Sequence, residues 1–235
     1  MRGIFITGTD TGVGKTMVGA AIAAAATKRG MRVGVSKPIE TGARENKSGH
    51  LVGEDCARLA AAAGNRQLPE EVASYLLRAP AAPVVAAREE HAHVDTNRLA
   101  ADVRHIAALN EFTIVEGAGG LMVPITDDYT YTELAIELGF PVLVVVGSRL
   151  GCVNHALLTL DALQRHGLRI AGWILKELAA SDPNPVAART NRELIASFTP
   201  AKYLGTMRWI GDGKHADFDT LAQHAEESLE LRAFL

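Results

Sequence analysis

A glycine-rich loop close to the N-terminus constrains the fold more than any other feature of the sequence. Residues 8–16 read Gly-Thr-Asp-Thr-Gly-Val-Gly-Lys-Thr, between a short apolar run and an alanine-rich segment. Glycines in such a loop allow backbone amides to turn toward a phosphate at the N-terminus of the following helix. The Lys15 ammonium would neutralise phosphate charge, and the Thr16 hydroxyl would bind Mg²⁺. The loop therefore predicts a strand, a phosphate site and a helix in succession.

The length and one side chain of this loop depart from common patterns. Five residues separate Gly8 from Gly14, where the standard phosphate-binding loop has four. The alternative interpretation is a glycine turn followed by an incidental lysine, which the strand–loop–helix context disfavours. Partition-type ATPases, which are nucleotide-switched binding proteins, carry a second lysine early in the loop. Asp10 stands at that place here and counts against such a switch.

Short apolar runs alternate with helical stretches through most of the chain. The runs are apolar throughout, as expected of strands buried on both faces. The predicted strands are residues 3–7, 32–36, 112–115, 142–146, 169–175 and 202–204. The predicted helices are residues 14–29, 54–63, 96–109, 130–138, 153–166 and 185–197. This alternation predicts an α/β protein with a three-layer P-loop NTPase fold, in which helices cover both faces of a mostly parallel sheet.

Composition and charge narrow the class of protein. The chain has 235 residues, of which 48% are hydrophobic and 22% charged, and no composition shift divides it, so residues 1–235 are predicted to form a single domain. Residues 43–53 and 180–185 are predicted to be loops, and residues 219–235 a surface helix. A net charge of −3 gives no reason to expect nucleic acid or an anionic membrane as partner. The apolar run at residues 141–147 is too short to cross a bilayer, and Cys56 and Cys152 are expected to be reduced thiols, so a cytoplasmic protein is expected.

Charged side chains follow two further predicted strands. Glu116 ends an apolar run and precedes Gly-Ala-Gly-Gly, which places a carboxylate at the ligand edge of the sheet, where P-loop proteins hold Mg²⁺. Lys37 ends the second run, where its ammonium could hold an oxyanion formed during reaction. A strand cap and a solvated lysine are the ordinary alternatives. Glu54 or Asp55 could supply another oxygen ligand to Mg²⁺, and the spacing does not choose between them.

Taken together, these stretches resemble the dethiobiotin synthetase family. The resemblance covers most of the chain and rests on GTDTGVGKT, KPIETG, residues 78–83, VEGAGG and residues 150–155. The five-residue spacing of the phosphate loop is a property of that family. Members close the ureido ring of dethiobiotin from 7,8-diaminononanoate, CO₂ and a nucleoside triphosphate, usually ATP. The resemblance implies that one amine becomes a carbamate, the carbamate is phosphorylated, and the second amine expels phosphate.

The resemblance also implies a role for individual residues. Lys15 and Lys37 would be catalytic, and Mg²⁺ would be held by Thr16, Asp55 and Glu116, which favours Asp55 over Glu54. The implied nucleotide-binding residues are Gly12, Val13, Gly14, Lys15, Thr16, Met17, Asp55, Glu116, Gly117, Ala118, Gly119 and Lys176. The implied substrate-binding residues are Thr41, Leu150, Gly151, Cys152 and Asn154. The last four would meet the substrate carboxylate across a homodimer interface.

Two departures from the family concern the base. Familiar members have Asn, which reads adenine, where this chain has Lys176. Lysine has only donors, whereas asparagine offers both a donor and an acceptor to a base edge. The later stretch that usually reads Ile-Pro-Trp is Met207-Arg208-Trp209 here. We therefore expect ATP as co-substrate, with other nucleoside triphosphates also accepted.

Three other functions were weighed against this one. A P-loop amidoligase would carry a glutaminase domain with a nucleophilic cysteine, and neither Cys56 nor Cys152 lies in such a setting. A nucleotide-switched binding protein is disfavoured by Asp10. A paralogue that binds nucleotide without closing the ring is disfavoured by the presence of Lys37, Thr41 and the three implied Mg²⁺ ligands.

Overall fold

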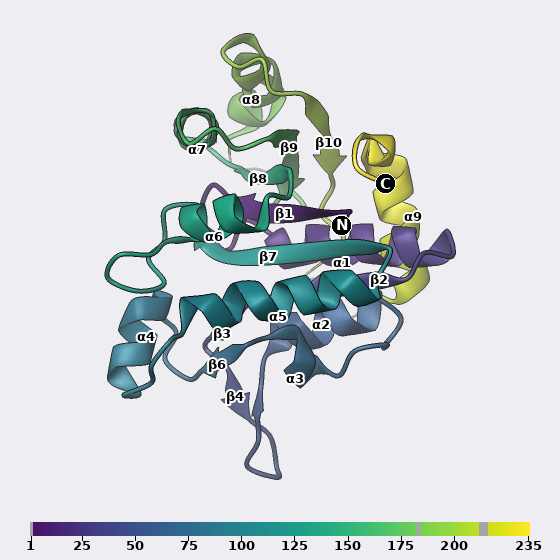
Figure 1. Ribbon diagram of the computed structural model, residues 1–235. Coiled ribbons are helices and arrows are strands. Elements are labelled where there is room, and N and C mark those ends of the chain that lie inside the picture. The colour runs from purple at the N-terminus through teal and green to yellow at the C-terminus, as the bar shows by residue number, and fades with distance from the viewer. Residues whose placement is uncertain (1, 182–183, 212–215) are drawn as a thin grey trace.

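A parallel sheet of six strands forms the centre of the protein (Figure 1). The computed structural model describes residues 2–181, 184–211 and 216–235. The strands, in sheet order, are β10 (Tyr203–Met207), β9 (Ile170–Glu177), β8 (Val142–Ser148), β1 (Gly3–Gly8), β7 (Phe112–Gly120) and β2 (Val33–Ser36). All neighbouring pairs are parallel, so the carboxyl ends of the strands share one edge. The P-loop-type α/β fold predicted from the sequence is confirmed.

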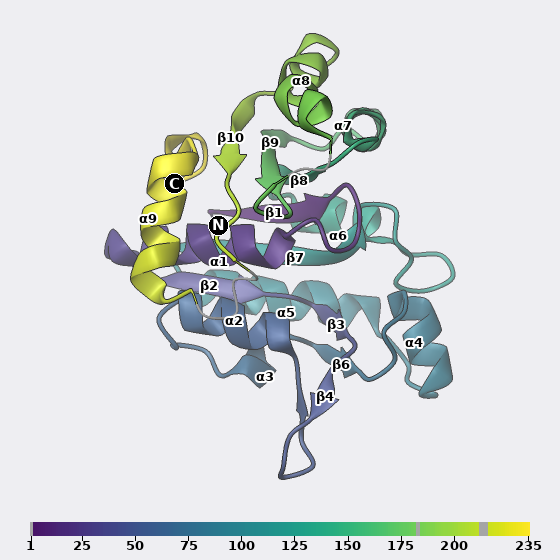
Figure 2. The same cartoon turned by 180° about the vertical axis from the view of Figure 1, so that it is seen from behind.

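Helices cover both faces of the sheet, and each face has its own apolar core. The first face holds α1 (Lys15–Lys28), α2 (Glu54–Ala62), the short α3 (Pro69–Val72) and α9 (Phe218–Ser228). The second holds α4 (Pro83–Glu89), α5 (Thr96–Leu109), α6 (Tyr131–Leu138), α7 (Cys152–Arg165) and α8 (Pro185–Ser197). Figure 2 shows α1 and α9 side by side on the first face. None of the described helices is both long and apolar enough to cross a membrane.

Helix α1 is buried on almost every side, which explains its alanine content. Every residue from Ala20 to Ala26 is fully buried, between the sheet on one side and α2 and α9 on others. Small side chains let these elements approach the helix closely while still removing apolar surface from water. The first turn of α1, which follows the phosphate loop, is therefore fixed against the sheet.

Most predicted elements occur within two residues of their expected limits, but two predictions about strands were wrong. The strand expected at residues 112–115 is β7 and continues to Gly120, because Ile6 pairs with Glu116 and Gly8 pairs with Gly120 across the sheet. Glu116 is therefore inside a strand and does not end it. The strand expected at residues 202–204 is β10 and extends to Met207.

Two further expectations need correction. Residues 43–53, expected to be a loop, contain a two-stranded hairpin of β4 (Arg44–Glu45) and β5 (Leu51–Val52). The helix expected at residues 219–235 ends at Ser228, and a 3₁₀ turn at Leu231–Ala233 follows. Part of the loop expected at residues 180–185 lies outside the described residues. A parallel pair of β3 (Ile39–Thr41) and β6 (Tyr75–Leu77) was not predicted at all.

Gly205 in β10 lies against the end of α9, so a substitution there tests how closely α9 packs against the sheet. Its φ is +132°, and a Cβ built there would lie 2.0 Å from the carbonyl oxygen of Ser228. Gly205→Ala is expected to lower the free energy of unfolding by about 3 kcal/mol, because backbone strain and overpacking add. Gly30→Ala is the control, since Gly30 also has a positive φ but open space around it, and about 1 kcal/mol is expected. Equal losses for both variants in urea unfolding would contradict this account.

Candidate active site

The loop between β1 and α1 has the backbone geometry of a phosphate site. Gly12 and Gly14 have φ of +74° and +89°, in the left-handed region that favours glycine. Gly14 is the N-cap of α1 and has no side-chain cap, so the first amides of the helix face the loop. Val13 is buried beneath the loop and packs against the end of β8. An anion is favoured at this helix N-terminus.

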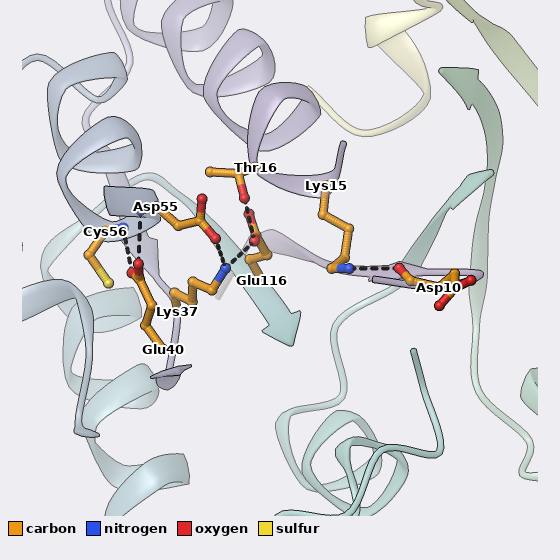
Figure 3. A network of polar contacts seen from close by, with 8 residues as sticks. All are labelled: Asp10, Lys15, Thr16, Lys37, Glu40, Asp55, Cys56 and Glu116. Atoms are coloured by element: carbon orange, nitrogen blue, oxygen red, sulfur yellow. Dashed lines mark hydrogen bonds and ion pairs between the residues drawn. The ribbon is translucent and has the colours of Figure 1, made fainter. Parts of the chain in front are cut away.

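Lys15 lies folded back over this loop. Its ammonium donates a hydrogen bond of 3.1 Å to the carbonyl oxygen of Asp10 (Figure 3). Burial lowers the pKa of Lys15, and the nearby carboxylate of Glu116 opposes that effect. Lys15 therefore carries a poorly hydrated positive charge at the phosphate loop, where an anionic ligand would stabilise it.

The Asp10 carboxylate is bound by two groups of its own chain. Its carboxylate accepts a hydrogen bond of 2.7 Å from the amide of Thr11 and forms an ion pair with Arg149, which follows β8. The Thr11 hydrogen bond, with Arg149, lowers the pKa of Asp10. The side chain thus holds the loop to the neighbouring strand and presents no positive charge to a second subunit.

Four side chains from different elements meet beside the phosphate loop (Figure 3). The Thr16 hydroxyl donates to Oε1 of Glu116 at 2.8 Å, and the Lys37 ammonium donates to the same oxygen at 2.8 Å. Lys37 also forms an ion pair with Asp55. Lys37 is 5% exposed and Glu116 is fully buried. The sequence prediction that Lys37 points to the same edge as the loop is confirmed.

The pKa shifts of Lys37 and Asp55 both favour the charged forms of these two side chains. Burial alone would lower the pKa of Lys37, but the carboxylates of Glu116 and Asp55 together outweigh it and raise the pKa. Burial would likewise raise the pKa of Asp55, and the charge and hydrogen bond of Lys37 lower it instead. A positive charge held between two negative charges is thus the state that the fold stabilises.

The structure shows which of Asp55 and Glu54 faces the cluster, a choice that the sequence spacing left open. Asp55 points from the first turn of α2 into the cluster (Figure 3). The Glu54 carboxylate lies 3.4 Å from Arg44 on the hairpin and is 63% exposed. Adjacent helical residues point in directions about 100° apart, so the phase of α2 selects one of the two.

The oxygen atoms of Thr16, Asp55 and Glu116 fit a Mg²⁺ ion. Oε2 of Glu116 is buried and accepts no hydrogen bond within the described structure. A buried carboxylate oxygen left without a donor is costly unless a cation or water satisfies it. Across the described ranges no three His, Cys, Asp or Glu side chains form a metal-binding group. Two carboxylates and a hydroxyl suit Mg²⁺, which keeps several waters and binds substrate phosphates.

A cleft of about 820 Å³ extends from the cluster in two directions. Toward the second face of the sheet its wall includes Thr41 and residues 80–83, together with Ala118, Gly119 and Val123. Toward β9 and β10 its wall includes Lys176, Glu177, Leu178, Trp209 and Gly211. The phosphate loop and the charged cluster lie between the two halves. The cleft is therefore large enough for two ligands that meet at Lys15 and Lys37.

Most of the predicted site residues line this cleft, but a second group does not. Gly12, Gly14, Lys15, Thr16, Met17, Lys37, Thr41, Asp55, Glu116, Ala118, Gly119 and Lys176 line it. Val13 and Gly117 are buried behind its wall. The segment of Leu150, Gly151, Cys152 and Asn154 lies at the start of α7, outside the cleft; Leu150 is 70% exposed and Cys152 is buried.

The Lys176 ammonium is engaged by neighbouring groups of the protein. Its ammonium donates hydrogen bonds of 2.6 Å and 3.1 Å to the carbonyl oxygens of Glu177 and Arg208. The ammonium also lies 5.6 Å from the centre of the Trp209 ring. Burial lowers its pKa, with Glu177 opposing. The resemblance placed Trp209 near the base, and sequence reasoning gave no role to Glu177 or Leu178. Glu177 ends β9 and Leu178 follows it, so both could have been found from the sheet order alone.

Comparison with known proteins identifies the family. A family model described as an AAA domain matches residues 2–215. The chain is 42% identical over 214 residues to the ATP-dependent dethiobiotin synthetase BioD of Anaeromyxobacter dehalogenans, with 90% of this chain and 92% of that protein covered. It is 40% identical over 206 residues to the protein of the same name from Aromatoleum aromaticum, with 88% and 90% covered. The chain belongs to the dethiobiotin synthetase family.

Solved structures agree with this fold at low sequence identity. The MinD cell division protein of Aquifex aeolicus has a TM-score of 0.53 at 16% identity, with 97% of this chain and 96% of that chain covered. A ParA family ATPase from Chlorobium tepidum has a TM-score of 0.53 at 15% identity, with 96% and 91% covered. Likeness at this level concerns the fold alone.

Membership of the dethiobiotin synthetase family makes the protein an ATP-dependent ligase.

The charged cluster yields a test of stability. Lys37→Met is expected to lower the free energy of unfolding at pH 7 by about 3–5 kcal/mol, because the buried Glu116 and the partly exposed Asp55 lose their counter-charge. Lys28→Met is the control, since Lys28 forms an ion pair of 2.8 Å with Asp219 in which both side chains are exposed, and at most about 1 kcal/mol is expected there. Urea unfolding measures both. A similar loss for the two variants would show that the Lys37 pairs contribute no more than a surface pair.

Proposed function

We propose that this cleft closes the ureido ring of dethiobiotin from 7,8-diaminononanoate, CO₂ and a nucleoside triphosphate. The observation that carries the proposal is the position of Lys37. Its ammonium lies where the phosphate half of the cleft meets the half lined by Thr41 and residues 80–83. A group that forms on a second ligand and must receive a phosphoryl group would meet the phosphoryl donor there.

Thr16, Asp55 and Glu116 are the proposed Mg²⁺ ligands. The bound ion supplies positive charge that neutralises the triphosphate during phosphoryl transfer. The Thr16 hydroxyl and both carboxylates lie within one cluster. The backbone from Gly12 to Met17 would surround the phosphates, and Ala118, Gly119 and Glu116 would lie along the nucleotide and substrate.

The two lysines have separate proposed roles. Lys15, held over the loop by the Asp10 carbonyl, would stabilise the transferring phosphoryl group. Lys37 would hold the carbamate formed when one amine of the diamine takes up CO₂ and loses a proton. The carbamate oxygen then attacks the γ-phosphorus and the nucleoside diphosphate leaves. The second amine, near Thr41, attacks the carbamoyl carbon, phosphate leaves, and the amine's proton passes to solvent.

A homodimer would complete the substrate site. The segment of Leu150, Gly151, Cys152 and Asn154 lies outside the cleft of its own chain and begins α7, whose N-terminus favours an anion. We propose that it contacts the substrate carboxylate in the cleft of a second subunit. The exposed Leu150 side chain is consistent with an interface.

Phosphate release tests the proposed reaction. The purified protein with Mg²⁺-ATP and bicarbonate should release phosphate, and fix labelled CO₂ into an acid-stable product, only when 7,8-diaminononanoate is present. Lys37→Ala should reduce both signals by at least about a thousandfold, which equals about 4 kcal/mol of transition-state stabilisation. Lys47→Ala, at an exposed hairpin lysine, should leave both unchanged. Phosphate release without the diamine, and with no label fixed, would contradict the proposal.

Nucleotide selectivity is a separate prediction. Two of the three Lys176 donors are engaged by the carbonyls of Glu177 and Arg208, and Lys176 offers no acceptor to a base edge. Trp209 adds a ring face, and stacking on an aromatic ring is tolerant of the base. We therefore expect kcat/KM for CTP and GTP to lie within about tenfold of that for ATP, which is about 1.4 kcal/mol. Steady-state kinetics with each nucleotide measure this, and a large preference for ATP would contradict it.

A further inference from the structure

Glu40 is a buried carboxylate that faces the start of α2 and has no part in the function described above. It lies within β3 and is 5% exposed. Its Oε1 accepts a hydrogen bond of 3.0 Å from the amide of Asp55, and its Oε2 accepts one of 2.9 Å from the amide of Cys56 (Figure 3). Both carboxylate oxygens therefore bind consecutive amides in the first turn of α2.

This contact replaces the cap that the helix lacks. The first amides of a helix have no partner within the helix. Gly53, the N-cap of α2, provides no side-chain hydrogen bond. A carboxylate that accepts from such amides forms strong, charge-assisted hydrogen bonds and also interacts favourably with the helix dipole. Glu40 thus caps α2 from a strand that lies 15 residues before Asp55 in the sequence.

Gly53 is glycine because of this carboxylate. A Cβ built on Gly53 would lie 2.2 Å from Oε2 and 2.5 Å from Cδ of Glu40. The backbone of Gly53 has φ −89° and ψ 123°, which any residue can adopt. The close approach of Glu40 therefore excludes a larger side chain at this position.

We propose that Glu40 is a positioning residue for Asp55, an inference that rests on the proposed role of Asp55 as a Mg²⁺ ligand. Glu40 holds the amide of Asp55, and Lys37 holds its carboxylate. With both ends of the residue fixed, the carboxylate stays directed toward Thr16 and Glu116. Groups that orient the ligands of a metal contribute to its affinity although they do not touch it.

Two variants should weaken metal binding by the same route. Glu40→Gln keeps the size of the side chain but replaces one acceptor oxygen with a donor, so one amide of α2 loses its partner. Gly53→Ala leaves Glu40 intact and displaces its carboxylate. The probe is Mn²⁺, titrated by electron paramagnetic resonance into protein saturated with a non-hydrolysable ATP analogue. Each variant should weaken Mn²⁺ binding about tenfold, and the double variant should be no weaker than the stronger single one, because both act on one contact.

A second helix cap is the matched control. The Asp95 carboxylate accepts hydrogen bonds of 3.0 Å and 3.4 Å from the amides of Asn97 and Arg98 at the start of α5, away from the cleft. Asp95→Asn should lower Tm by an amount comparable to that of Glu40→Gln and leave Mn²⁺ affinity unchanged. Asp55→Asn, which alters the proposed ligand itself, should weaken Mn²⁺ binding at least as much as either Glu40→Gln or Gly53→Ala.

The outcomes distinguish this inference from the proposed function. If Glu40→Gln and Gly53→Ala lower Tm but bind Mn²⁺ as the wild type does, Glu40 is only a cap and the inference is wrong. If Glu40→Gln does not fold, the Gly53→Ala titration decides alone. Failure of the proposed function would appear elsewhere, as a wild-type protein that fixes no labelled CO₂ with the diamine.

Discussion

The rest of the site depends on one buried ammonium between two carboxylates. Removing Lys37 and Glu116 from water costs several kcal/mol for each charge, and their attraction to each other and to the partly exposed Asp55 offsets this only with good geometry. The fold supplies that geometry because Lys37 follows β2, Glu116 lies within the adjacent β7, and Asp55 opens α2. Among the described residues, the same arrangement leaves Oε2 of Glu116 without a hydrogen-bond donor. With one ammonium against two carboxylates, the cluster has an excess of negative charge and can accept a cation.

Close approach of backbones makes this arrangement possible. The first turn of α1 must lie near β7 for Thr16 to reach Glu116 at 2.8 Å. Gly19 on the same helix shows how tight the contact is, since a Cβ there would lie 3.2 Å from Leu59 and 3.6 Å from Oε2 of Glu116. The small residues that follow in α1 continue this close packing against the sheet. The phosphate loop and the proposed Mg²⁺ ligands therefore share one rigid support.

Sequence reasoning predicted what is local and missed what depends on distant partners. The phosphate loop and the helices at residues 96–109 and 185–197 were predictable because caps, glycines and periodicity lie within each segment. The full extent of β7 was not predictable. Its glycines suggest a loop, and only their pairing with β1 shows that the strand continues to Gly120. The spacing left Glu54 and Asp55 open and only the family resemblance favoured Asp55, whereas the phase of α2 shows which side chain faces the cluster. The role of Glu40 was not predictable, because β3 was not predicted and its partners lie 15 and 16 residues away.

Asp10 distinguishes the phosphate loop of this protein from that of partition-type ATPases. The structural relatives at about 15% identity include a cell division protein and a ParA family ATPase. In partition-type ATPases, the early lysine of the loop reaches a partner's nucleotide. Here the equivalent place carries a negative charge held by Thr11 and Arg149. A carboxylate there would repel a partner's phosphates instead of binding them.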